Sequence, residues 1–423
     1  MTPVEKDPGP RPSLILSHPG TLQLLYGIFA AAAGAGYETK LWTGYFFDER
    51  GHIERLAGRL PGRLGARLQR ELRRRQSDLV PAEQVVRLPL LEFGTVAALR
   101  AFRRFGPLTR LIGWRNAIFD RLVAAKLRRD PPSIVMPVDS AALRTIRAAR
   151  AVGTRSVLNQ TIGHVAVGQR ILAEEAELQP DWADSMPARM PPDLIERARG
   201  EALEADRVLA PSDYVKGTLM EIGVPAERIW VLPYGVRTDR FTPAQPRGDR
   251  SWPFRILYVG QISQRKGLAY LLEAVRRLGR KDIELLLVGS IVGSGAGLRR
   301  FQGRFRHLDN RPHAELPELY RSADLFAYPS LHEGSAQAIM EAMACGLPAV
   351  VTANAGSVLR EGVEGHLVPI RDVERLAERI EELYRDRDRL AAMGAAARRR
   401  AEEHDWSHYR DGLGGLLATL APR

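Results

Sequence analysis

The sequence predicts an α/β protein made of two doubly wound, Rossmann-like domains that face one another across a cleft. Short apolar segments alternate with helical segments along most of the chain, which is typical of parallel sheets covered by helices. The alternation stops at residues 241–253, FTPAQPRGDRSWP, where proline and glycine punctuate the chain, and then restarts. A length of 423 residues is also too great for one ordinary core.

The first series of elements opens with a short strand at Leu14–Leu16, an apolar helix that ends near Ala33, and a strand at Glu38–Trp42. These three elements form a β-loop-α-β unit. A basic helical stretch follows. The later strands are predicted at Ile134–Pro137, Arg155–Leu158, Arg207–Ala210 and Ile229–Leu232, and the later helices at Ser140–Ala151, 193–206 and Tyr214–Ile222.

The second series restarts with a strand at Phe254–Val259. Its other strands are predicted at Ile283–Val288, Leu325–Tyr328 and Ala349–Thr352, and its helices at Leu268–Leu278 and Leu316–Arg321, with another after Ser335 and more toward the end of the chain. We therefore predict a first domain at residues 1–240 and a second at 241–405. A last helix at 406–423 is expected to pack back on the first domain.

The composition is that of an ordinary globular protein, with 45% hydrophobic and 26% charged residues. Cys345 is the single cysteine, so no intramolecular disulfide can form, which suits a reducing compartment. The first residues are polar and proline-rich and do not read as a secretory signal. The first apolar stretch, Leu22–Ala35, is about 14 residues long and too short to span a bilayer. We expect a cytoplasmic protein that at most rests on the inner face of a membrane.

The net charge of +12 is concentrated in one stretch. Residues 50–129 carry 19 Lys and Arg but six Asp and Glu, so the rest of the chain is close to neutral. Arginines alternate there with Leu, Phe, Ile and Trp114, a pattern that suits an anionic lipid surface or an anionic acceptor. A solvated basic face and a nucleic-acid surface are the alternatives, and we expect no nucleic acid.

The most informative run is HEGSAQAIMEAMACGLPAV at residues 332–350, which starts in a loop and continues into a helix. Ser335 is expected to cap the helix, which Gly346 and Pro348 end. The N-terminal amides of a helix favour an anion such as phosphate. Glu333 and Glu341 lie at this end of the helix, where carboxylates can help a phosphate ligand only by accepting hydrogen bonds from its hydroxyls. Phosphate and hydroxyls together suggest a nucleotide sugar, whereas two isolated glutamates would be ordinary solvated residues.

This run resembles the EX7E signature of glycosyltransferase family 4, the group 1 retaining glycosyltransferases. The chain departs from the family at Ser335 and Ala336, where Phe and Gly are usual. Residues 200–385 resemble the family densely, and ILYVGQISQRKGLAYLLEAV resembles its donor-side phosphate loop. The resemblance implies the GT-B architecture, with an acceptor-side first domain and a nucleotide-sugar donor domain second.

The cleavage of a sugar–diphosphate bond needs fixed positive charge at the leaving phosphate. In the family a basic pair grips the diphosphate, and Gln261 replaces one usual arginine here, so Arg265 and Lys266 are expected to do so. Gly260 lets the backbone approach the phosphates closely. The resemblance also implies that Glu333 contacts the sugar and that Glu341 accepts hydrogen bonds from the ribose.

Further site residues follow from the same resemblance. The amides of Gly334, Ser335 and Ala336 are expected to bond the sugar or phosphate. His164 lies about where the family has a histidine that faces the donor sugar, although a lone histidine is more often structural. Gly20 matches a glycine loop near the donor phosphates, with His18 beside it as a weaker candidate. The site residues are therefore Glu333, Lys266, Arg265 and His164 as catalytic residues, and Glu341, Gly334, Ser335, Ala336, Gly260 and Gly20 as donor-binding residues.

The resemblance implies a retaining transfer of a sugar from an NDP-sugar, UDP- or GDP-linked. No cofactor and no metal are expected, since Asp386 and Asp388, which spell a DxD tag, fall on a charged helix. The acceptor is predicted to be a lipid-linked or cell-surface polysaccharide intermediate. The alternatives are a soluble small-molecule acceptor, and a non-catalytic protein that binds a nucleotide sugar or nucleic acid.

Overall fold

The computed structural model describes residues 11–20, 23–48, 50–51, 54–55, 69, 72, 75–89, 91–94, 108–244 and 253–420. Its packing divides the chain into two compact units. The first unit consists of residues 1–159, 190–209 and 410–423, and the second of residues 160–189 and 210–409. The domain boundaries predicted after residues 240 and 405 stay predictions. The chain passes from one unit to the other at residues 159–160, 189–190, 209–210 and 409–410.

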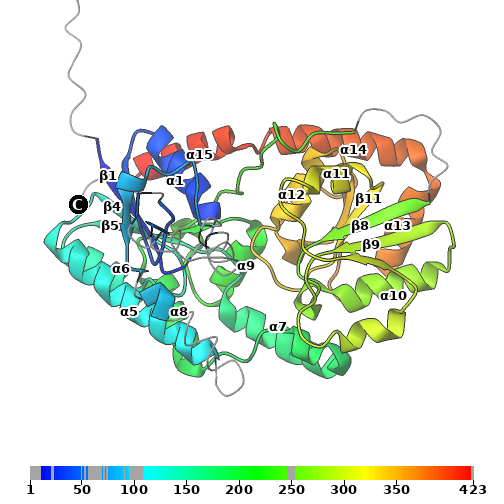
Figure 1. Cartoon of the computed structure of the whole chain (residues 1–423), viewed down its shortest axis with the longest axis horizontal. Helices are drawn as coiled ribbons and strands as arrows, with labels where there is room; N and C mark the ends of the chain where they lie inside the picture. The colour runs from blue at the N-terminus through cyan, green and yellow to red at the C-terminus, as the bar shows by residue number, and fades with distance from the viewer. Residues whose placement is uncertain are drawn as a thin grey trace, which may run out of the picture. The chain divides into compact units, whose positions relative to one another are not determined.

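The described residues form two sheets, as the strand alternation predicted (Figure 1). The first has seven strands in the order β3-β2-β1-β4-β5-β6-β7. Pairings from β1 to β2 and β4, from β2 to β3, and from β4 through β5 to β6 are parallel. The strands are β1 Ser13–His18, β2 Glu38–Thr43, β3 Val85–Arg87, β4 Ile134–Pro137, β5 Arg155–Asn159, β6 Arg207–Ala210 and β7 Ile229–Val231.

Helices of the first unit cover this sheet. They are α1 Leu24–Gly34, α5 Leu108–Arg129, α6 Leu143–Ala151 and α8 Pro192–Glu204. Helix α5 packs against α6, which in turn packs against α8 (Figure 1). Buried Phe119, Val123 and Leu127 of α5 share a core cluster with Ile15 and Val135 of the sheet. The last helix, α15 Trp406–Ala418, runs from the second unit into the first.

The second sheet has six strands in the order β10-β9-β8-β11-β12-β13, and each recorded pairing is parallel. The strands are β8 Phe254–Val259, β9 Ile283–Val288, β10 Arg306–Leu308, β11 Leu325–Tyr328, β12 Ala349–Thr352 and β13 Gly365–Val368. The helices are α10 Leu268–Leu278, α11 Leu316–Arg321, α12 Gln337–Ala344, α13 Val373–Arg385 and α14 Arg387–Glu402. Helix α10 packs against α13, and α12 against α14.

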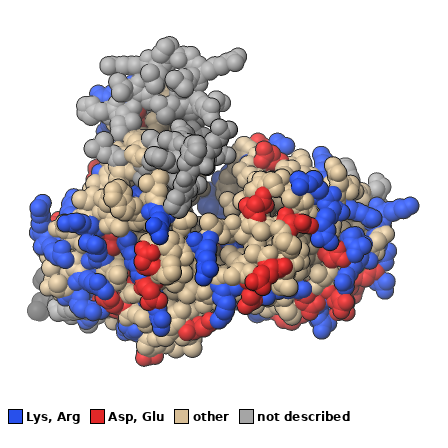
Figure 2. Space-filling view, turned by 90° about the horizontal axis from the view of Figure 1, so that it is seen from below, with Lys and Arg blue, Asp and Glu red and all other residues tan. Residues whose placement is uncertain are grey.

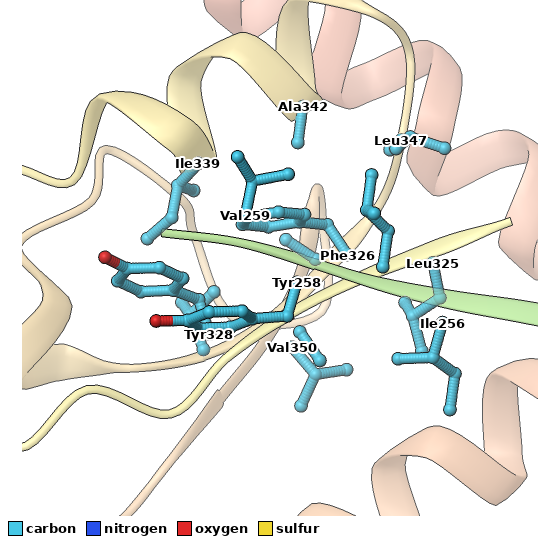
Figure 3. Packing of buried hydrophobic residues seen from close by; sticks show 14 of the residues in the cluster. Ile256, Tyr258, Val259, Leu325, Phe326, Tyr328, Ile339, Ala342, Leu347 and Val350 are labelled. Carbon is cyan, nitrogen blue, oxygen red and sulfur yellow. The ribbon is translucent and has the colours of Figure 1, made fainter. Parts of the chain in front are cut away.

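The core of the second unit lies between this sheet and its helices. Strand β11 and most of β8 and β12 are apolar because both faces of the sheet are buried there, as in other parallel sheets. Figure 3 shows Ile339 and Ala342 of α12 packed over Val259 and Phe326. Tyr258 and Tyr328 stack with their ring centroids 5.3 Å apart, and their hydroxyls lie at the same end of the sheet.

One part of the second unit comes from the chain before residue 241. Helix α7 (Val165–Leu178), a 3-10 helix at Pro180–Ser185 and helix α9 (Asp213–Glu221) all precede the interruption at 241–253. Trp182 packs where a Cβ on Gly297 would lie 2.2 Å from its ring, so only glycine fits there. Sequence reasoning predicted neither α7 nor the short strands β3, β10 and β13, because their few apolar residues show no clear period.

Candidate active site

The positive charge of the site comes from the turn that follows β8. Gly260 has φ of 153° and ends the strand, and a 3-10 turn then places Arg265 and Lys266 just before α10. Gly267 has φ of 71°, and a Cβ there would lie 2.0 Å from the carbonyl oxygen of Pro329. Glycine is therefore required at this position, where the turn lies against the chain leaving β11.

The carboxylate of Glu333 binds both cations. Arg265 Nη1 lies 3.0 Å from Glu333 Oε2, and Lys266 Nζ contacts the same oxygen. Strands β8 and β11 are parallel neighbours, so the turn after β8 and the loop after β11 leave the sheet at one edge. The Lys266 ammonium also lies 5.2 Å from the ring centroid of Tyr328. Burial, and next the Arg265 charge, lower the pKa of Lys266, whereas the Glu333 carboxylate in contact with Nζ favours the charged ammonium.

The backbone of the Glu333 loop is held from several sides. The amide of Gly163 donates to the carbonyl of Glu333 at 3.1 Å, and Ser212 Oγ donates to the carbonyl of Gly334 at 2.6 Å. A Cβ on Gly334 would lie 1.9 Å from the carbonyl oxygen of Thr161. The second position of the EGSA motif therefore needs glycine for a close backbone contact.

The start of α12 differs from the prediction. Its N-cap is Ala336, and the N-cap makes no side-chain hydrogen bond, so the predicted Ser335 cap is wrong. The Ala336 amide donates to the carbonyl of Ala355 at 3.2 Å. The loop before α12 therefore lies against the 3-10 turn at Ala353–Ala355, and this backbone hydrogen bond takes the place of a side-chain cap. Ligand contacts of the amides at 334–336 stay a prediction.

Glu341 lies one turn into α12, and its carboxylate is bound by other residues. His313 Nε2 lies 2.8 Å from Oε1, and the Tyr320 hydroxyl donates to Oε2 at 2.8 Å. Tyr320 is buried, which together with the Glu341 charge raises the pKa of its hydroxyl well above the usual value. The structure thus brings Arg265, Lys266 and Glu333 into direct contact, and places Glu341 in a separate cluster with His313 and Tyr320. Its predicted role at the ribose is untested.

His164 is the N-cap of α7 and is almost fully buried. Its side chain accepts a hydrogen bond from the Ala166 amide at 3.3 Å, and its own amide donates to Thr218 Oγ1 at 2.9 Å. These contacts account for a structural role, and contact with the donor sugar stays a prediction.

His332 was missed by sequence reasoning, although it directly precedes Glu333. Its Nδ1 lies 2.7 Å from the Tyr214 hydroxyl, and a Cβ on Gly168 would lie 2.5 Å from its ring. Burial, and next the charge of Arg265, lower its pKa to about 4, so the imidazole is neutral near pH 7. The Arg265 guanidinium donates to the His332 carbonyl at 2.8 Å.

A buried carboxylate under the basic turn was also missed. Glu175 of α7 is fully buried and accepts hydrogen bonds from Gln264 Nε2 at 2.7 Å and from the Tyr270 hydroxyl at 2.8 Å. Arg371, which has φ of 68°, donates from Nε to Glu175 at 2.8 Å. Gln264 immediately precedes Arg265 and Lys266, so Glu175 supports the turn that carries them. An acidic residue on an otherwise amphipathic helix gives no local signal of this role.

The predicted donor-binding Gly20 lies in the first unit, after β1. Its carbonyl lies 2.8 Å from His18 Nδ1, and a Cβ there would lie 3.6 Å from Arg115 Nη1. Burial lowers the pKa of His18 to about 4. Arg115 is paired with Glu92 at 3.3 Å. These contacts do not test a role for Gly20 in donor binding.

Cys345 and Asp386 have structural roles. Burial raises the pKa of Cys345 to about 12, as for a packing residue rather than a nucleophile. Asp386 is the N-cap of α14 and accepts from the Arg389 amide at 2.9 Å. Within the described residues no group of three or more His, Cys, Asp or Glu could hold a metal ion.

Comparisons of sequence identify relatives that match about half of the chain. The family profile described as "Glycosyl transferases group 1" matches residues 253–386. A D-inositol 3-phosphate glycosyltransferase of Nocardia farcinica is 32% identical over 250 residues, which cover 52% of this chain and 55% of the relative. A putative colanic acid biosynthesis glycosyltransferase, WcaL, of Salmonella typhimurium is 31% identical over 234 residues, which cover 51% and 57%. The chain thus spans about half the length of these curated relatives.

Comparisons of structure extend over nearly the whole chain. Sucrose-phosphate synthase of Thermosynechococcus elongatus superposes with a TM-score of 0.67 at 18% identity, covering 97% of this chain and 99% of that one. HepE of Anabaena, solved in complex with UDP and glucose, superposes with a TM-score of 0.63 at 16% identity, covering 97% and 100%. This likeness confirms the predicted GT-B fold class. The family profile over residues 253–386 and the names of the sequence relatives confirm the predicted resemblance to the group 1 glycosyltransferases.

Proposed function

We propose that the protein is a retaining, metal-independent glycosyltransferase that moves a hexose from a UDP- or GDP-sugar. The observation that carries this proposal is the meeting of Arg265, Lys266 and Glu333 at the edge where β8 and β11 end. Two cations suit a diphosphate, and a carboxylate beside them suits sugar hydroxyls. The names of the two sequence relatives, both glycosyltransferases, and the UDP bound by HepE support the same donor class.

In the proposed reaction the acceptor hydroxyl attacks C1 on the same face of the sugar ring from which the diphosphate leaves. The C1–O bond to the phosphate breaks, and the acceptor proton passes to the leaving phosphate. Arg265 and Lys266 neutralise the charge that grows on that phosphate, with no metal ion. Glu333 accepts hydrogen bonds from the sugar and steadies the developing ring cation, Glu341 holds the ribose, and His164 faces the sugar.

Donor turnover in the presence of EDTA tests this proposal. The protein is incubated with a panel of NDP-sugars and candidate acceptors after metal removal, and release of the nucleoside diphosphate and the anomeric configuration of the product are measured. We expect one NDP-sugar to be consumed at an unchanged rate with EDTA, and the product to keep the anomeric configuration of the donor. Turnover that EDTA abolishes and Mg²⁺ restores would refute metal independence, and no turnover with any donor would favour a binding protein.

The acceptor is proposed to be a lipid-linked or surface-polysaccharide intermediate at the inner membrane face, because of the outer side of α5. Trp114, Ile118 and Leu122 are spaced by four residues on one side of the helix and are 71%, 38% and 44% exposed. Exposed basic side chains flank this stripe, namely Arg110, Arg121, Lys126, Arg128 and Arg129. Figure 2 views the molecule from below Figure 1 and shows basic and acidic side chains interspersed with uncharged surface on that face.

An apolar stripe between cations is the pattern of a helix that lies on an anionic lipid surface. Within the described residues no helix is long and apolar enough to cross a membrane. The remainder of the predicted surface at 50–129, with Phe102 and Phe105, falls largely outside the described residues. A soluble acceptor is the second candidate, since the name of the Nocardia farcinica relative specifies a phosphorylated inositol.

Co-sedimentation with vesicles separates these two candidates. We expect binding to phosphatidylglycerol vesicles at low salt, weaker binding at high salt, and at least about fivefold weaker binding for Trp114→Glu, which places a charge in the apolar stripe. Met220→Glu, at another exposed apolar residue that is 47% exposed, is the matched control and should bind as the native protein does. Equal binding by Trp114→Glu, or none by the native protein, would favour a soluble acceptor.

A further inference from the structure

Glu333 neutralises the two cations that the proposed reaction assigns to the diphosphate. Arg265 and Lys266 both contact one carboxylate oxygen, Oε2. The side chains of Arg265, Lys266 and Glu333 are 16%, 8% and 15% exposed, so water screens the cluster weakly. Any anion that binds these cations must therefore compete with Glu333.

The Glu333 loop and the two cations are held by contacts that do not involve the Glu333 carboxylate. The loop backbone is held by the Gly163 amide, by Ser212 Oγ and by the close contact of Gly334 with Thr161. The cations are held separately. The Arg265 guanidinium donates to the His332 carbonyl at 2.8 Å, and Lys266 lies over the Tyr328 ring. A rotation of the Glu333 side chain alone would release the carboxylate and leave the cations in place.

We propose that Glu333 is an internal counter-anion that the donor diphosphate displaces, and that the displaced carboxylate then accepts hydrogen bonds from the donor sugar. This inference rests on the proposed function. The proposal predicts that the site distinguishes a free diphosphate from an NDP-sugar. A free diphosphate must displace the Glu333 carboxylate without offering that carboxylate new hydrogen-bond donors. A diphosphate that carries a sugar supplies hydroxyls to the released carboxylate. The same residue therefore weakens binding of the free diphosphate and favours the intact donor.

Titration calorimetry with inorganic pyrophosphate measures the competition directly. Glu333→Gln removes the negative charge and keeps the shape of the side chain, so we expect pyrophosphate to bind about three- to tenfold more tightly than to the native protein. Sugar transfer by the same variant should fall. A merely structural role for Glu333 would weaken both. Glu333→Ala is the second variant, and thermal unfolding of each variant checks that it is folded.

Glu381→Gln is the charge-matched control. Glu381 lies on α13 and forms an ion pair with Arg280. This variant therefore changes the net charge by the same amount as Glu333→Gln and does not alter the surroundings of Arg265 and Lys266. Its pyrophosphate affinity should equal that of the native protein. Unchanged or weaker pyrophosphate binding by both Glu333 variants would overturn the inference and leave the proposed function standing. A native protein that bound neither pyrophosphate nor any NDP-sugar would overturn both.

Discussion

Replacing Lys266 by alanine is expected to raise the activation free energy of sugar transfer by about 2–4 kcal/mol, which lowers kcat/KM for the NDP-sugar roughly 30- to 1000-fold. Lys266 is buried beside Glu333 and at the end of the strand-exit turn, where its charge is only weakly screened by water. Charge develops on the leaving phosphate only as the bond to the sugar breaks. Most of the loss should therefore appear in kcat rather than in the donor KM. Steady-state kinetics over a range of donor concentrations measure both.

Lys281→Ala is the control for this experiment, because it removes the same charge from an exposed position. Its kinetics should match those of the native protein. If Lys266→Ala turned over at the native rate, Lys266 would have no role at the leaving phosphate, and the proposed site would lose its main support.

Replacing Glu175 by alanine is expected to destabilise the protein by about 3–5 kcal/mol. The change leaves the Gln264 amide and the Tyr270 hydroxyl buried without the carboxylate that they bind, and removes one partner of Arg371. It also frees the turn that carries Lys266, so activity should fall further than the loss of folded protein explains. Urea unfolding gives the free energy of unfolding, and kinetics well below the unfolding midpoint give the activity.

Glu174→Ala is the matched control, one residue away on the same helix. Glu174 also binds Arg371, at 3.0 Å, but is 53% exposed, so its loss should cost less than about 1 kcal/mol. A similar small cost for Glu175→Ala would mean that water or a neighbour replaces its hydrogen bonds. The conclusion that Glu175 of α7 stabilises the basic turn would then be wrong.

Local patterns of apolar residues in the sequence predict the architecture. The strands at Ile134–Pro137, Phe254–Val259 and Ile283–Val288 were predicted with the bounds that the structure has. Buried parallel strands are continuous apolar runs, and their signal is contained in a few adjacent residues. Arg265, Lys266 and Glu333 were also found locally, because each lies in a short run that resembles the family. The short strands and α7 have weaker runs and were missed.

The chain sequence by itself determined two alternating strand–helix series, a basic turn and an acidic loop, since each depends on neighbouring residues. Only the tertiary structure decided that Glu333 lies on both cations, that Glu341 faces His313 and Tyr320, and that α7 places Glu175 under the turn. The Arg265–Glu333 contact joins positions 68 residues apart, and the Gln264–Glu175 contact joins positions 89 apart. Such contacts arise when neighbouring parallel strands end at one edge and a distant helix packs against them, and no local pattern of residues encodes them.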